Sequence, residues 1–239
     1  MPTPAMNAPE ISKRLRGLAD PVIAAHAQRY FKTGKGEYGE GDKFLGIRVP
    51  VLRSQLKLCG EAALEDIQKL LLSAFHEVRL FALLLMVRQF SKGDAETRAA
   101  IYRLYLDHTR YINNWDLVDS SAHKIVGSHL ESRDRQILYK LARSNSIWER
   151  RIAVIATFHF IAINQFDDAL KLAQQLLNDK EDLIHKAVGW ALREIGKRDF
   201  AVEQTFLQAH YKNMPRTMLR YAIEEFPGPV RKQYLAGVV

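Results

Sequence analysis

Hydrophobic side chains recur at helical spacing along the chain from residue 64 onward. The recurrence places apolar residues three, four or seven positions apart, which gathers them on one face of a helix. Four stripes show it clearly: Leu64, Ile67 and Leu71; Val78, Phe81, Ala82 and Leu85; Val118, Ala122, Ile125 and Val126; Ala169, Leu172, Ala173 and Leu176. The strict alternation of a half-buried strand is hard to find. The pattern therefore predicts an all-α protein.

A helix-start signal and several polar segments set the limits of these predicted helices. Ser146 and Glu149 have the spacing of a capping box, in which a serine caps the helix start and a glutamate reaches back to it. Short polar stretches at residues 91–94, 178–180 and 213–215 follow apolar stripes. We expect these stretches to be short connections between successive helices.

A weak internal repeat is visible at a period near 35 residues. When similar segments are superimposed, their last residues are Arg79, Trp115, Arg151, Lys186 and Arg220. These positions are separated by 36, 36, 35 and 34 residues. A period of this length with two helices per unit indicates an α-solenoid of the HEAT or armadillo kind. The alternative is an irregular helical bundle in which the spacing arises by chance.

The repeat suggests how the chain is divided. We expect one HEAT-like repeat domain over residues 1–239, because the length suffices for a sizeable core and no long Gly- or Pro-rich linker interrupts it. The first 60 residues do not fit the period and are expected to form a cap. Residues 1–10 are expected to be a flexible tail.

Charge and cysteine content indicate the kind of binding partner and the cellular compartment. The chain has 35 Lys and Arg against 27 Asp and Glu, a formal net charge of +8, which suggests a polyanionic partner such as nucleic acid. The single cysteine, Cys59, cannot form an internal disulfide, which points to a reducing compartment. Neither a signal peptide nor an apolar run of membrane-spanning length is apparent. We therefore expect a cytoplasmic protein with no membrane partner.

Two segments match part of a known motif but lack the surrounding sequence that the motif requires. Residues 34–39 match the pattern GxGxxG, but no strand pattern precedes them and no helix opens from them, so we expect a loop. His76 and Glu77 begin like a zinc-protease motif that lacks its second histidine, and the eight histidines are scattered. No serine nucleophile elbow is found. We therefore expect no metal site and no cofactor.

The segment 183–197 forms a helix with an apolar and a basic side. The apolar side carries Ile184, Val188, Ala191, Leu192 and Ile195. The opposite side carries Lys186, Trp190, Arg193 and Lys197. An aromatic ring flanked by cations suits the backbone and sugars of a nucleic acid. Alternatively, Trp190 packs on the neighbouring repeat and the cations are simply solvated.

Segment 113–119 supplies a candidate carboxylate. With Asn114 as N-cap, Trp115 and Asp119 lie four residues apart on one helix face. A carboxylate beside an indole at the edge of a core is partly desolvated, as functional carboxylates often are. Alternatively, Asp119 is a helix-start aspartate that stabilises the helix dipole. Further along, Trp148 shares an apolar stripe and is expected in the core. Arg151, at the edge of that stripe, is a candidate for the concave face.

Four segments in register resemble the AlkD-type DNA alkylation repair glycosylases. They are FLGI at 44–47, WDLVD at 115–119, IWERR at 147–151 and KAVGWALRE at 186–194, and the resemblance covers roughly residues 20–225. It implies a superhelix of HEAT-like repeats with a basic concave face. It also implies a DNA glycosylase of base excision repair that acts on alkylated bases in duplex DNA without a deep base-flipping pocket. No catalytic lysine nucleophile is obvious, so we expect a monofunctional enzyme without lyase activity. We further expect a monomer that associates with the nucleoid through DNA binding.

The resemblance also implies roles for individual residues. The active-site tryptophans and aspartate of the family fall on Trp115, Trp190 and Asp119. Its DNA-contacting residues fall on Arg151, Arg193 and Tyr30, to which the basic helix face adds Lys186 and Lys197. The sequence departs from the family pattern at two places. His159 stands where the family has a lysine, and residues 33–42 are an insertion. Both departures bear on DNA binding and on the range of lesions.

These residues suit one kind of chemistry. Alkylation of a purine ring nitrogen makes the base cationic and already a good leaving group, so no general acid is needed. Asp119 would stabilise the positive charge that develops on the sugar and orient a water molecule, and the two indoles would favour a cation. The substrates would then be 3- and 7-alkylpurines. A non-catalytic HEAT-repeat DNA-structure binder and a protein-binding HEAT scaffold remain the alternatives.

Overall fold

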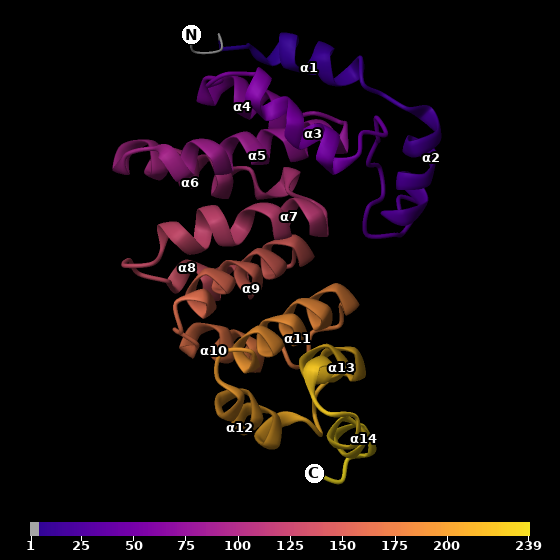
Figure 1. Ribbon diagram of the computed structural model, residues 1–239, viewed down its shortest axis with the longest axis vertical. Coiled ribbons are helices and arrows are strands. Elements are labelled where there is room, and N and C mark those ends of the chain that lie inside the picture. Colours follow the sequence, from indigo (N-terminus) through magenta and orange to yellow (C-terminus); the bar gives the residue numbers. More distant parts are fainter. Residues whose placement is uncertain (1–4) are drawn as a thin grey trace. The chain divides into compact units, whose positions relative to one another are not determined.

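The computed structural model describes residues 5–239, which form fourteen α-helices and no strand (Figure 1). This confirms the all-α class. The helices are α1 (Ala8–Arg16), α2 (Pro21–Tyr30), α3 (Val49–Gln55), α4 (Leu64–Leu71), α5 (His76–Lys92), α6 (Ala95–Asp107), α7 (Trp115–Ala122), α8 (Gln136–Leu141), α9 (Ile147–Ala162), α10 (Asp167–Gln175), α11 (Asp182–Gly196), α12 (Phe200–His210), α13 (Arg216–Ala222) and α14 (Gly228–Ala236). Internal contacts group the chain into two compact units, residues 1–121 and 122–239, which are described in turn.

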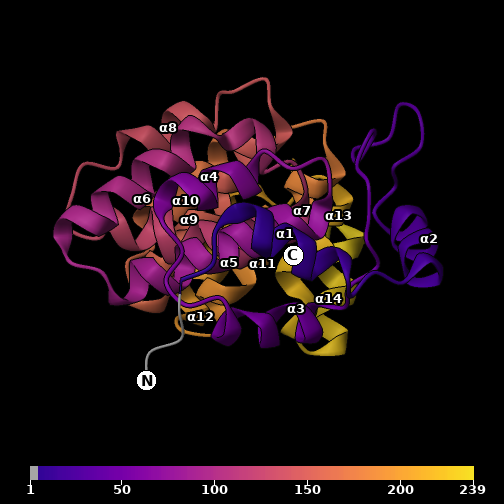
Figure 2. The same ribbon diagram turned by 90° about the horizontal axis from the view of Figure 1, so that it is seen from above.

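The first unit is built around α5. Every side chain from His76 to Met86 is buried, so this helix has no solvent face over three turns. A helix that is apolar nearly all round belongs in the middle of a core, and α3, α4 and α6 pack against it. By contrast, α2 buries none of its residues and stands at the margin of the unit (Figure 2).

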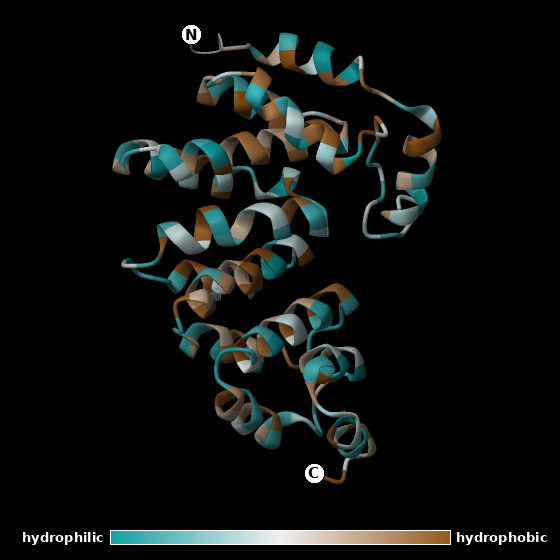
Figure 3. Cartoon of the chain, viewed as in Figure 1, coloured by the Kyte–Doolittle hydropathy of each residue, from teal (hydrophilic) through white to brown (hydrophobic). Residues whose placement is uncertain are grey.

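The second unit is built around α9 and α11. Helix α9 packs against α8, α10 and α11, and α11 packs in turn against α12 and α13. Figure 3 shows apolar and polar residues intermixed along these helices, and α9 is buried continuously from Arg151 to Thr157. Trp148 is 7% exposed, which confirms its predicted place in the core.

The 35-residue period corresponds to pairs of helices. The superimposed positions 79, 115, 151, 186 and 220 lie in α5, α7, α9, α11 and α13, so every second helix carries one of them. This regular placement agrees with the α-solenoid prediction rather than with chance spacing. Helices α1 to α3 fall outside the period, as expected for the first 60 residues.

Two glycines allow close contact between helices of the second unit. Helix α7 continues into a π-helical segment, His123–Gly127. A Cβ atom on Gly127 would lie 2.2 Å from the carbonyl oxygen of Ala156, and one on Gly189 would lie 2.4 Å from that of Met218. Such distances are far below van der Waals contact, so the packing of both pairs of segments requires glycine.

The predicted start of the helix after Ser146 is confirmed, and the predicted N-terminal tail needs a correction. Helix α9 begins at Ile147, and the Ser146 side chain accepts a hydrogen bond from the Glu149 backbone, as the helix-start signal predicted. The expected tail over residues 1–10 is too long, because a capping box between Asn7 and Glu10 starts α1 at Ala8. The part of that prediction covering residues 1–4 lies outside the described residues.

The remaining segments agree with expectation. Residues 34–39 form turns rather than a helix or strand, and the connections near residues 93, 178–180 and 213–215 are short. Over the described part of the chain, no helix has both the length and the apolar character needed to cross a membrane.

Candidate functional site

An aromatic cluster surrounds Trp115 in the first unit. We use the term for Tyr30, Phe31, Phe44, His76 and Trp115. The Trp115 indole stacks on Phe31, with ring centroids 5.3 Å apart and an interplanar angle of 23°, and the Tyr30 ring meets it edge-on at 6.0 Å. Tyr30 is 60% exposed and Trp115 is half-buried. The cluster is therefore anchored in the unit and also reaches its surface.

Asp119 lies one helical turn after Trp115 on α7 and is half-buried. The helix begins where predicted, because Asn114 precedes it and its side-chain oxygen accepts the Trp115 backbone N–H at 2.9 Å. Burial raises the pKa of the Tyr105 hydroxyl, and the negative charge of Asp119 raises it further. Asp119 is thus a carboxylate at the boundary between core and solvent, as its place in the stripe suggested.

A largely buried ionic network shares His76 with the aromatic cluster. His76 is bonded through Nδ1 to Asp42 at 3.2 Å and through Nε2 to Asp116 at 2.8 Å. The Arg79 guanidinium donates to the other oxygen of Asp42 at 2.7 Å and to the side-chain oxygen of Asn113 at 3.0 Å. This ionic network, defined by these five residues, joins α5, the loop before Phe44 and the start of α7. Sequence reasoning missed it.

Burial and charge oppose each other within the ionic network. Burial by itself lowers the pKa of His76, but the carboxylates of Asp116 and Asp42 outweigh it and raise the pKa to about 9. For Asp42, burial favours the neutral acid, yet the bonds to His76 and the charge of Arg79 hold its pKa below the usual value. At neutral pH the network therefore contains two cations and two carboxylates.

Glu77 has a structural role in the unit. Its buried carboxylate accepts the backbone N–H groups of Leu45, Gly46 and Ile47 at 2.7 to 3.2 Å. Gly46 has a φ of +82°, and a Cβ there would lie 2.0 Å from the Asp20 carbonyl oxygen. The FLGI segment is therefore an irregular stretch of backbone whose N–H groups are held by Glu77. Within residues 5–239, no group of three or more His, Cys, Asp or Glu side chains could hold a metal ion.

In the second unit, Trp190 and the predicted cations lie along α11. The Trp190 ring is half-buried and meets the Phe158 ring of α9 edge-on at 4.6 Å, while its Nε1 donates to Glu194 at 3.3 Å. Packing on the neighbouring repeat, the alternative weighed above, is therefore present. Contact with DNA stays a prediction for Trp190.

The cations of α11 have acidic neighbours. Lys186 pairs with Asp182 at 2.8 Å, Lys197 pairs with Glu194 at 2.9 Å, and Arg193 pairs with Glu224. Burial opposes ionisation of Glu194, but Lys197, Trp190 and Arg198 together outweigh this effect and lower its pKa. Each of the three predicted cations is thus paired with a carboxylate within the protein, and their contact with DNA stays a prediction.

Arg151 is placed differently from its prediction as an edge residue. It is 5% exposed, and its guanidinium donates to the Leu183 carbonyl at the start of α11. Its neighbour Arg150 pairs with Asp179 at 2.7 Å. A direct contact of Arg151 with DNA stays a prediction. His159, at the position of the family lysine, pairs with Glu131 at 2.8 Å.

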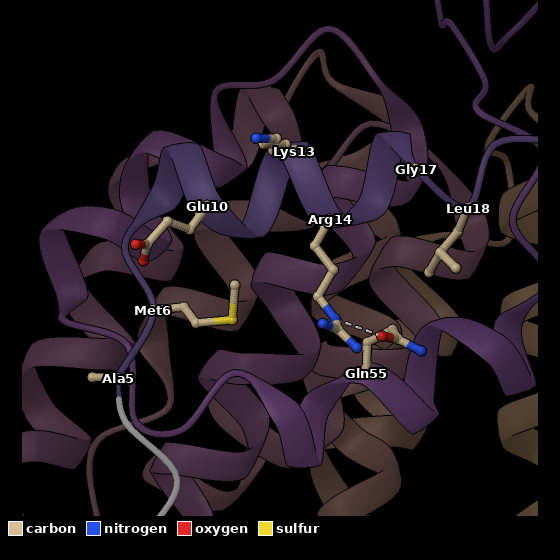
Figure 4. A pocket seen from close by; sticks show the side chains of 8 residues that line it. All are labelled: Ala5, Met6, Glu10, Lys13, Arg14, Gly17, Leu18 and Gln55. Atoms are coloured by element: carbon tan, nitrogen blue, oxygen red, sulfur yellow. Dashed lines mark hydrogen bonds between the residues drawn. The ribbon is translucent and has the colours of Figure 1, made fainter.

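A pocket of about 670 Å³ lies beside α1, away from the predicted residues. Its lining combines apolar and charged side chains, and Arg14 donates to Gln55 at 2.7 Å (Figure 4). None of the residues proposed for DNA binding or chemistry lines it.

The paired helices define an α-solenoid protein, and comparison with known proteins specifies the family. The chain belongs to the DNA alkylation repair enzyme family, whose model matches residues 11–226. A similar solved structure is a predicted DNA alkylation repair enzyme from Enterococcus faecalis, with 19% identity, a TM-score of 0.64, and coverage of 88% of this chain and 97% of that chain. At that identity the likeness shows the fold alone. No curated protein matches the chain. Family membership supports a role in alkylation repair and implies DNA as the partner.

Proposed function

We propose that this protein is a monofunctional DNA glycosylase that hydrolyses the N-glycosidic bond of cationic 3- and 7-alkylpurines in duplex DNA. One observation carries the proposal: in a chain of this family, Asp119 lies one turn from Trp115 on α7, and both are half-buried. A carboxylate and an indole on one helix face can stabilise positive charge that develops next to them.

The reaction needs little from the protein because the lesion is already charged. The bond between C1′ and the base nitrogen breaks, and its electron pair leaves with the base, which becomes neutral. The positive charge passes to the sugar as an oxocarbenium-like centre, which Asp119 stabilises. Water then adds to C1′ and releases a proton. The products are a free base and an abasic site.

The indoles supply the second part of the stabilisation. A cation over an indole face gains about 0.5 to 2 kcal/mol. Trp115 is held by Phe31 on one side of its ring system, so its orientation is set before DNA binds. Trp190 on α11, held by Phe158 of α9 and by Glu194, offers a second indole in the other unit.

DNA binding would depend on the exposed aromatic ring and on the cations. Tyr30 projects from a helix that buries none of its residues. Lys186, Arg193 and Lys197 would exchange their carboxylate neighbours for phosphates, at a gain that includes release of counterions from DNA. Arg151 would act with them, through the start of α11 to which it is bonded.

The test is release of free base from methylated duplex DNA by the purified protein. We expect 7-methylguanine and 3-methyladenine in solution, and abasic sites that break only after alkaline treatment. Strand cleavage during the reaction would contradict the monofunctional assignment. Salt-sensitive DNA binding without base release would identify a non-catalytic DNA binder, and absence of DNA binding would favour a protein-binding scaffold.

A further inference from the structure

We propose that His76 is a charged positioning residue, held between Asp42 and Asp116, that fixes the orientation of the Trp115 indole. The inference rests on the proposed function only in giving Trp115 a part in catalysis. His76 itself is 1% exposed and is the buried member of the aromatic cluster, so it acts through other residues rather than by touching DNA.

The hydrogen bonds of His76 require the charged ring. Nδ1 faces a carboxylate oxygen of Asp42, and Nε2 faces a carboxylate oxygen of Asp116. An ionised carboxylate only accepts hydrogen bonds, and a neutral imidazole has a single N–H. Both contacts are satisfied together only when both ring nitrogens carry protons. With both carboxylates ionised, the geometry therefore specifies an imidazolium ion.

The charges around the ring agree with this state. The charged groups that face His76 are Asp42, Asp116 and Arg79. With the imidazolium present, two positive and two negative charges balance in a largely buried region, where the side chains of His76, Arg79 and Asp42 are each at most 5% exposed. Loss of the proton would leave one carboxylate charge without its partner, which is costly for buried groups. Neutralisation of His76 therefore has to disturb the bonds to Asp42 or to Asp116.

Two contacts transmit the position of His76 to Trp115. The imidazolium lies against the rings of Phe44 and Phe31, with centroids 4.6 and 4.9 Å away, and Phe31 stacks in turn on the indole. In addition, Asp116 directly follows Trp115 and accepts the Leu117 backbone N–H at 2.9 Å. The ring stack and the first turn of α7 thus both depend on His76.

The first experiment examines the protein without a substrate. In ¹H–¹⁵N spectra of the histidine rings, assigned with His76→Gln, we expect both His76 nitrogens to carry protons at pH 7 and to titrate near pH 9. The indole N–H signal of Trp115, assigned with Trp115→Phe, should move with the same midpoint and should not titrate in His76→Gln. A neutral His76 at pH 7, or an indole signal indifferent to His76, overturns the proposal.

The second experiment measures base release. His76→Gln should slow single-turnover excision of 7-methylguanine by about tenfold or more, since small displacements in an active site have effects of this size, while DNA affinity stays within about twofold. The matched control is His108→Gln, because His108 bonds to Gln68 and to its own helix and has no carboxylate partner in those bonds. Equal excision by His76→Gln and the wild type contradicts the proposal.

A milder variant covers the case in which His76→Gln fails to fold. Asp116→Asn keeps the size of the side chain and removes one charge, so the His76 titration should fall by about one pH unit or more and excision should slow with it. An unchanged titration overturns the proposal. If the wild type releases no base, the proposed function fails, while the ring and indole titrations still decide the role of His76.

Discussion

Asp116 and Asp119 lie three residues apart on α7, and their surroundings give them different roles. Asp116 has one oxygen on His76 and the other on the Leu117 backbone N–H, so its charge serves the ionic network. Asp119 lies one turn after Trp115, and its charge acts on the Tyr105 hydroxyl. Of the two, Asp119 is the carboxylate that we assign to the chemistry.

Replacement of Asp119 by Asn should greatly reduce excision and leave DNA affinity nearly unchanged. The benefit of the carboxylate appears only as charge develops on the sugar, so its loss affects the transition state. Removal of such stabilisation costs about 100-fold or more in rate. Single-turnover base release measures this effect, with Asp107→Asn, an exposed aspartate at the end of α6, as control. Normal excision by Asp119→Asn would refute the assignment.

Glu203 should make the stability of the second unit depend on pH. Its carboxyl is 2% exposed, and burial raises its pKa to about 8, although Arg193 opposes the shift. The folded state therefore holds a proton that the unfolded state releases near pH 4.5, so stability falls as pH rises from 4.5 through 8. Glu203→Gln removes this loss and should stabilise the protein at pH 7 by up to about 3 kcal/mol.

Urea unfolding at several pH values tests the Glu203 prediction. The difference between Glu203→Gln and the wild type should be small at pH 4.5 and should grow up to pH 8. The control is Glu225→Gln, because Glu225 is exposed. A stability difference that is constant with pH would contradict the prediction.

At the scale of elements, helix contacts in the second unit depend on two positions without a side chain. Gly127 ends the π-helical segment against α9, and Gly189 lies in the middle of α11 against α13. Trp190 follows Gly189 directly, so the depth at which α11 and α13 pack also sets where this indole lies in its unit. Helix packing and the candidate site are therefore coupled along α11.

Gly189→Ala should destabilise the protein although alanine favours helices. The added Cβ would lie 2.4 Å from the Met218 carbonyl oxygen and 2.5 Å from the Tyr221 side chain. Overpacking of this kind costs about 1 to 3 kcal/mol, more than the roughly 1 kcal/mol that alanine gains in a helix. Thermal unfolding is the measurement, and Gly228→Ala is the control because nothing lies within 4 Å of its Cβ position. If Gly189→Ala and the wild type melted at the same temperature, α13 would have to shift without cost, which would contradict the prediction.

At the scale of the whole molecule, the net charge of +8 and the family membership both point to DNA. In the second unit, Arg193 and Lys197 of α11 are paired with the carboxylates of Glu224 and Glu194. Local pairing of this kind reduces the non-specific attraction of the protein to DNA. The paired cations can still exchange their carboxylate partners for DNA phosphates. We therefore expect the lesion, rather than the overall charge, to determine which sites are processed.

The range of substrates should follow the charge of the base. An enzyme that supplies one carboxylate and two indoles has no group to protonate a neutral leaving base. We expect single-turnover release from duplexes that carry 7-methylguanine, and none from matched duplexes with uracil or 8-oxoguanine at the same position. Comparable rates on all three would reveal a general acid or base pocket beyond the residues proposed here.

The sequence by itself determined the all-α class, the paired helices and the helix faces of Trp115 and Trp190. These features follow from local spacing, because apolar periodicity and helix-start signals act within a few residues. The resemblance to the DNA alkylation repair family rested on segments that are contiguous in the chain, and the family assignment confirmed it.

Only the tertiary structure decided which charges meet and which helices lie in contact. His76 is 34 residues from Asp42 and 40 from Asp116, so no local pattern could show that one ring bridges both carboxylates. The burial of Arg151 depends in the same way on the start of α11. Helical periodicity gives the direction of a side chain from its own helix, whereas the partner it meets depends on how distant helices pack.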